Sequence, residues 1–305
     1  MTQPSAATTK PAADGQSEGL GIALVFGSAF FWSFAGAIAR FLHISDNWTV
    51  VFWRCLFGAL FLLVFMLLRD GPRGTVKLFS GMGWPGIVVG LCFTVASTCF
   101  IIAISHTTIA NVLLIGGGVP LIAALISWIF FRERISGFTW VAIFVVIFGV
   151  LVMVSGSLTG TVSPIGDALA LLTATVFAIA VVITRRFPHV RMTPATCFGC
   201  LVAAAIAASQ AGSLSVTAGE MALLFVFGAF NLGLGLALFV TGARLIPSAL
   251  AALLGTSETM LGPVWVAVIH GEIPELRTII GGAMILVALI GYLTMQFRRQ
   301  ARSAA

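Results

Sequence analysis

The sequence predicts an all-α integral membrane protein with ten transmembrane helices arranged as two inverted five-helix repeats. Three observations predict this class: the composition, the length of the apolar segments and an internal repeat. Hydrophobic residues make up 59% of the 305 residues, charged residues make up 9%, and the mean hydropathy is +1.11. Soluble domains carry about a quarter charged residues, so the composition excludes a soluble protein.

The apolar residues form ten segments of about 20 residues, which is the length that a helix needs to cross a bilayer core roughly 30 Å thick. We expect spans at residues 20–41, 48–68, 84–105, 108–131, 137–155, 165–184, 194–212, 220–241, 248–270 and 276–297. The connecting segments are too short for a further soluble domain. A membrane β-barrel would instead show alternating segments of about ten residues.

Both ends of the chain are polar. Residues 1–18 are rich in Ala, Thr, Ser and Pro, which predicts a disordered cytoplasmic tail. They lack the basic segment followed by a short apolar core that is typical of a cleaved signal peptide. Residues 298–305 form a basic tail.

Two pairs of similar segments indicate an internal repeat. The stretch "PLIAALISWIFFRERIS" from Pro120 resembles "TMLGPVWVAVIHGEIPE" from Thr259, and "GIALVFGSAFFWSFAGAIAR" from Gly21 resembles "GDALALLTATVFAIAVVITR" from Gly166. Residues 19–156 and 163–297 are therefore two copies of one unit. Because each copy has an odd number of spans, the second copy is inserted upside down. Inverted repeats are typical of alternating-access transporters.

The distribution of lysine and arginine predicts the orientation. Thirteen of these residues lie on the side of the N-terminus and two on the opposite side, with Arg54 inside the second span. The positive-inside rule then places both termini in the cytoplasm, and we expect a multi-pass protein of the cell inner membrane. The net charge of +6 is spread over loops rather than clustered with aromatic residues, so we expect the lipid bilayer, and no nucleic acid, as a partner.

Polar and aromatic residues share helix faces in two spans. Trp32 and Gly36 lie on one face of span one, and Asn231, Gly235 and Phe239 lie on one face of span eight. Such faces serve either helix packing or a ligand site. The residues that we predict to bind substrate are Trp32, Ser97, Asn111, Phe177, Asn231 and Glu258.

Glu258 lies inside an apolar span, where an ionised carboxylate costs at least a few kcal/mol. Three interpretations remain open. The carboxyl is neutral and hydrogen-bonded to Ser257 or a neighbouring helix, it binds a substrate ammonium group, or it takes up and releases a proton in each transport cycle. Of the two functional interpretations, we favour contact with the ammonium group.

Glycine and proline predict a break in span four at Gly116, Gly117, Gly118 and Pro120. In span nine, Pro263 is the position where we expect a gate or a break in the helix. The alternative is a plain proline kink. Unwound backbone at membrane depth is tolerated only beside protein or a water-filled cavity. For Arg54 we favour a side chain that snorkels to the outer headgroups, and a guanidinium that attracts a substrate carboxylate is the alternative.

The patterns of catalysis and of cofactor binding that the sequence formally matches lack the context that such sites require. Cys197 and Cys200 form a C-x-x-C inside an apolar span, without the context of a redox motif. The four histidines lie near span ends and are not spaced as metal ligands. There is no P-loop, so we expect secondary transport with no cofactor and no metal.

Several motifs resemble the drug/metabolite transporter superfamily with paired EamA domains. They are the ten spans in a 5+5 arrangement, "PLIAALISWIFFRERIS", the weaker copy "GPVWVAVIHGEIP", and "VFWRCLFGALFLL" with its arginine early in span two. Within this family, the chain is most similar to inner-membrane exporters of aromatic amino acids. The resemblance implies a central cavity bounded by spans one, three, four, six, eight and nine. One departure is Thr259, which stands where the first repeat has Pro120.

The predicted function is therefore export of small metabolites, with amino acids, including aromatic ones, as the expected substrates. A drug or other metabolite exporter on the same fold is the alternative within transport. An intramembrane enzyme or a lipid-handling protein is the alternative from another class. The oligomeric state does not follow from the sequence.

Overall fold

The computed structural model describes residues 12–132, 137–159, 163–187, 189–243, 245–246 and 248–304, and every regular element in them is a helix. This confirms the all-α class. The helices are α1 (Ala12–Ser33), α2 (Ala35–Phe41), α3 (Asn47–Ser80), α4 (Gly83–His106), α5 (Ile109–Gly116), α6 (Val119–Phe131), α7 (Gly137–Thr159), α8 (Pro164–Arg186), α9 (Thr193–Gln210), α10 (Ala218–Phe225), η1 (Val226–Leu234), α11 (Gly235–Gly242), α12 (Ser248–His270) and α13 (Leu276–Ala304).

Each of the ten predicted segments coincides with one helix or with a run of consecutive helices. Within the described residues, seven helices are long and apolar enough to cross a membrane, or eight when the bent pair α5 and α6 forms one span. The predicted segments 137–155 and 248–270 correspond to α7 and α12. The chain is thus a multi-pass membrane protein.

Helix ends differ from the prediction in three places. α1 begins at Ala12 and so includes residues that we expected in a disordered tail, whereas residues 1–11 lie outside the described part. α13 continues to Ala304, into the predicted basic tail. α3 extends to Ser80 beyond a kink at Gly71, whose φ of 72° and ψ of 172° suit glycine, with Pro72 next to it.

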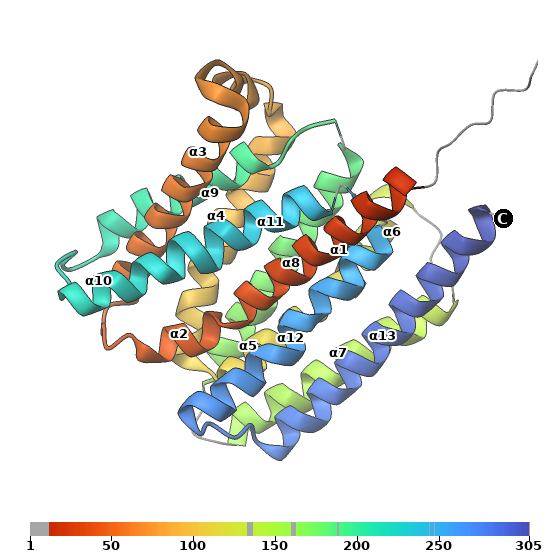
Figure 1. Ribbon diagram of the computed structural model, residues 1–305. Coiled ribbons are helices and arrows are strands. Elements are labelled where there is room, and N and C mark those ends of the chain that lie inside the picture. The colour runs from red at the N-terminus through yellow and green to blue at the C-terminus, as the bar shows by residue number, and fades with distance from the viewer. Residues whose placement is uncertain are drawn as a thin grey trace, which may run out of the picture.

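Helix packing follows the symmetry of an inverted repeat (Figure 1). Spans two and seven pack together as α3 and α9, and spans five and ten pack together as α7 and α13. α4 of span three packs on α8 of span six. In the corresponding contact, η1 and α11 of span eight pack on α1 of span one. The contact of α5 and α6 with α8 corresponds to that of α12 with α1. These are the pairs that a twofold axis exchanging spans n and n+5 requires, as expected for a chain built of two repeats.

The packing divides the centre of the molecule into two bundles. The first bundle consists of α4, α5, α6 and α8, and the second consists of α1, η1, α11 and α12. They meet where α5 contacts α12. There Leu113 lies directly against Gly262, and a Cβ added at Gly117 would lie 2.9 Å from the Cγ2 of Thr259. Small residues at these positions allow the two backbones to approach closely.

Three of the predicted spans have irregular backbone. Span four is bent by 43° between α5 and α6, which confirms the predicted break in that span. Span one is interrupted at Phe34, between α1 and α2, and span eight contains the π-helix η1. π-helical turns occur frequently at functional sites. By contrast, α12 continues through Pro263 without interruption, so the span-four break has no counterpart in span nine.

Candidate functional site

Arg54 lies in the interior of the protein, so the snorkelling interpretation is wrong. Its side chain on α3 is 6% exposed. The guanidinium carbon lies 4.6 Å from the ring centroid of Phe227 on η1 and 5.4 Å from that of Phe100 on α4. The side chain therefore lies between α4 and η1. An aromatic ring on each of these helices makes a favourable contact with the cation.

The donors of Arg54 have no acceptor among the residues that the structure describes. Among the described residues, no hydrogen bond or ion pair to this side chain is formed, and its Nε is completely buried. Cys55 follows it on α3, and the buried Ser97 lies on α4 one turn before Phe100. Buried polar groups are nearly always hydrogen-bonded in native proteins, and a buried charge without a partner is costly. The arrangement is therefore incomplete without a further group.

Glu258 provides the opposite charge. It is half-buried on α12, directly before Thr259, where α12 crosses the break in span four. Within the described part of the chain, its carboxylate has no hydrogen bond to Ser257 or to another helix. Glu258 and Arg54 form no direct ion pair with each other. Among the described residues, Arg54 and Glu258 are thus an interior cation and an interior acidic group that do not neutralise each other in an ion pair.

The predicted faces of spans one and eight meet each other. The ring of Trp32 lies directly on Gly235, and its centroid is 5.5 Å from that of Phe239. Asn231 donates through Nδ2 to the carbonyl of Phe31 at 2.6 Å and to that of Trp32 at 3.4 Å, which stabilises the interruption between α1 and α2. Part of each of the two faces, on span one and on span eight, is therefore used in helix packing. The ring of Trp32 remains partly exposed.

Two further buried oxygens lack a partner among the described residues. They are Oδ1 of Asn231, one turn after Phe227, and Oγ1 of Thr173 on α8. Together with Nε of Arg54, they come from three spans and from both repeats. Unpaired polar atoms of this kind suit a site that holds a polar ligand or ordered water.

Asn111 and Phe177 make contacts of their own within the protein. Asn111 belongs to a buried network near the ends of α4, α5, α8 and α13. In it Asp167, 1% exposed, accepts from Thr107 at 2.6 Å and from Asn111 at 3.0 Å, and Thr278 donates to Asn111 at 2.7 Å. Phe177 packs between α8 and α4, with its ring 6.1 Å from that of Phe93. The network connects the two repeats.

Sequence reasoning did not identify Asp167, and it favoured the wrong placement of Arg54. The pattern at Asp167 was visible, since an acidic residue follows Ser163 and Pro164 in the first turn of a span. Acidic residues are favourable there through the helix dipole. Its burial depends on Thr107 and Asn111 from the other repeat, which the local sequence does not show.

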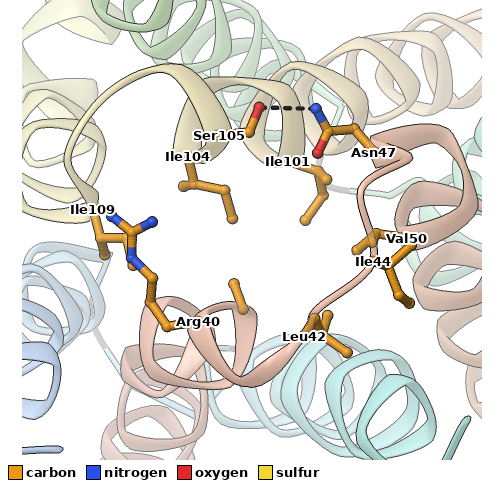
Figure 2. A pocket seen from close by; sticks show the side chains of 10 residues that line it. Arg40, Leu42, Ile44, Asn47, Val50, Ile101, Ile104, Ser105 and Ile109 are labelled. Carbon is orange, nitrogen blue, oxygen red and sulfur yellow. Dashed lines mark hydrogen bonds between the residues drawn. The ribbon is translucent and has the colours of Figure 1, made fainter. Parts of the chain in front are cut away.

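A separate small pocket opens near the ends of α2, α3, α4 and α5 (Figure 2). It has a volume of about 200 Å³ and is lined mainly by aliphatic side chains. On one wall Asn47 donates to Ser105 at 2.8 Å. Arg40 borders the pocket and forms a two-point ion pair with Glu272. Because ligand pockets usually measure about 300–1,000 Å³ and none of the predicted binding residues lines this one, we do not assign the substrate to it.

The fold and this interior polar site define a multi-pass membrane protein of two inverted repeats. The chain belongs to the EamA-like transporter family, which matches residues 19–155 and 164–294. The two matched segments lie within the two predicted repeats. The chain is accordingly a member of a family of membrane transporters.

Known proteins are similar at low identity. Solute carrier family 35 member F2 from Mus musculus is 29% identical over 131 residues, which are 40% of this chain and 35% of that protein. The match therefore spans about a third of the relative's length. A solved crystal structure of a protein superposes with a TM-score of 0.65 at 18% identity and covers 92% of this chain and 98% of that one. The likeness to the solved structure shows a shared fold.

Proposed function

We propose that the protein is a secondary transporter that exports amino acids, including aromatic ones, across the cell inner membrane by alternating access. The observation that carries this proposal is the carboxylate of Glu258, which lies inside the membrane region without a protein partner among the described residues. Ionisable residues at such positions are usually functional and face a substrate pathway. A substrate ammonium group would provide the missing counter-charge.

Aromatic side chains beside Arg54 favour a substrate with an apolar part. Phe100 and Phe227 flank the guanidinium, and Trp32 is partly exposed in the second bundle. Ligand sites commonly combine apolar walls with a few polar groups that fix orientation. Among these candidates, Trp32, Ser97, Asn231 and Glu258 remain our predicted binding residues. Asn111 and Phe177 are better explained by contacts within the protein.

Alternating access requires two bodies that move around one site. The first and second bundles are suited to this, because their contact is concentrated at α5 and α12. The glycines Gly116, Gly117 and Gly118 and Pro120 allow α5 to tilt relative to α6. We propose that α5 and α12 separate when the transporter opens toward the outside, and that Pro263 softens α12 at the same level.

The orientation is part of this proposal. We place the cytoplasm on the side of both termini, so a cysteine introduced near Asp46, between α2 and α3, is expected to react with an impermeant thiol reagent added to intact cells. A reporter fused after Ala305 is expected to lie in the cytoplasm. Labelling of position 46 only after permeabilisation would reverse the orientation and the direction of export.

Flux measurements in liposomes test the substrate class. The purified protein is reconstituted and loaded in turn with labelled amino acids, cationic drugs and fluorescent lipids. We expect efflux of amino acids, with phenylalanine among the faster ones, and no net movement of lipid. Flux of drugs without amino acids would favour the alternative exporter, and lipid movement alone would show that the protein handles lipids.

A further inference from the structure

The guanidinium of Arg54 is held in a way that leaves its donors available. Phe227 and Phe100 lie 4.6 Å and 5.4 Å from its central carbon, so they contact it through their rings. Cation–π contacts stabilise the charge but use none of the N–H groups. A guanidinium has five N–H donors in a planar fork that matches a carboxylate, and none of the five has an acceptor within the described residues.

A purely structural role would not explain this geometry. An arginine that is 6% exposed and without a hydrogen bond is expensive to bury. An arginine that supports packing alone would find backbone carbonyls or a carboxylate at direct contact distance. Glu258 is a second ionisable residue inside the spans without a hydrogen bond or ion pair among the described residues, and it forms no direct ion pair with Arg54.

We propose that Arg54 binds the carboxylate of the transported substrate, so that the site accepts zwitterions with the substrate placed between Arg54 and Glu258. The guanidinium forms charge-assisted hydrogen bonds to the carboxylate, and Glu258 binds the ammonium group. Phe100 and Phe227 keep the guanidinium in place before the substrate arrives. This inference rests on the proposed function and adds the substrate's second polar contact.

The two charges also define what the site rejects. A substrate without a carboxylate leaves the donors of Arg54 unpaired, and a site with unpaired buried polar groups discriminates strongly against such an analogue. Amines and amino-acid amides should therefore be poor substrates, although they retain the ammonium group and the side chain. Arg54 would thus determine specificity between amino acids and amines.

Flux of phenylalanine and of phenylalaninamide in liposomes tests this inference. In the wild type, we expect phenylalanine to move at least about tenfold faster, because a charge-assisted hydrogen bond contributes roughly 1.5–3 kcal/mol. Arg54→Met is expected to lower phenylalanine flux about tenfold and to leave the flux of phenylalaninamide within about twofold of the wild type. Arg54→Lys should restore part of the preference, since it keeps the charge without the fork.

Arg69→Met is the matched control, because Arg69 is an exposed arginine on the same helix. It should leave both fluxes unchanged. Equal loss of both fluxes in Arg54→Met, or an unchanged preference, would overturn the inference while amino-acid transport by the wild type would still support the proposed function. If Arg54→Met does not fold, we compare instead how much phenylalanine and phenylalaninamide raise the melting temperature of the wild type and of Arg54→Lys. Equal stabilisation of the wild type by phenylalanine and by phenylalaninamide would then contradict the carboxylate contact.

Discussion

Replacement of Glu258 by glutamine is expected to lower amino-acid flux severalfold without lowering the amount of folded protein. Glutamine keeps the shape of the side chain and removes its charge. Because Glu258 has no direct partner within the described residues, loss of the charge should leave the fold intact and weaken the contact with a substrate ammonium group. Initial efflux rates of labelled phenylalanine from liposomes measure the effect, with folded protein quantified by size-exclusion chromatography.

The control for this substitution is Glu275→Gln, since Glu275 is exposed between α12 and α13. It should transport like the wild type. If Glu258→Gln retains wild-type flux at every pH, the charge is dispensable and Glu258 has a structural role. If its flux merely becomes independent of pH and keeps its maximum rate, the carboxyl instead takes up and releases a proton during transport.

Replacement of Asp167 by alanine is expected to destabilise the protein. Asp167 is 1% exposed and accepts hydrogen bonds from Thr107 and Asn111. Its removal leaves buried donors of the first repeat without this acceptor, at a cost of about 1–3 kcal/mol for each group that stays unsatisfied. Thermal unfolding in detergent, followed by tryptophan fluorescence, measures the loss.

Asp70→Ala provides the comparison, because Asp70 forms an ion pair with Arg191 at 2.6 Å with both side chains partly exposed. Exposed ion pairs contribute about 0–1 kcal/mol, so this variant should unfold close to the wild-type temperature. A melting temperature of Asp167→Ala equal to that of Asp70→Ala would show that the network between the two repeats does not stabilise the protein.

Much of the fold could be predicted because the bilayer restricts what a span can be. Apolar segments of about 20 residues must form helices, since lipid satisfies no backbone hydrogen bond. The pairs Pro120 with Thr259 and Gly21 with Gly166 revealed the repeat. The break in span four was likewise visible in the glycines before Pro120, because these residues disfavour a continuous helix.

The interior site was harder to predict because tertiary neighbours determine it. An arginine seven residues into a span suits both snorkelling and burial, and only Phe100 and Phe227, from two other spans, favour burial. The interruption after Ser33 has no proline, and its freed carbonyls are satisfied by Asn231 from the second repeat. No local pattern indicates such a contact.

Exchange across the membrane tests the central claim most directly, namely that two inverted repeats alternate around one amino-acid site. Liposomes containing the purified protein are loaded with unlabelled phenylalanine, and uptake of labelled phenylalanine is compared with uptake into empty liposomes. We expect loaded liposomes to take up the label faster and to accumulate it transiently, because substrate on one side returns the carrier to face the other. Equal uptake by loaded and empty liposomes, at a rate no higher than that of protein-free liposomes, would contradict alternating-access transport of amino acids.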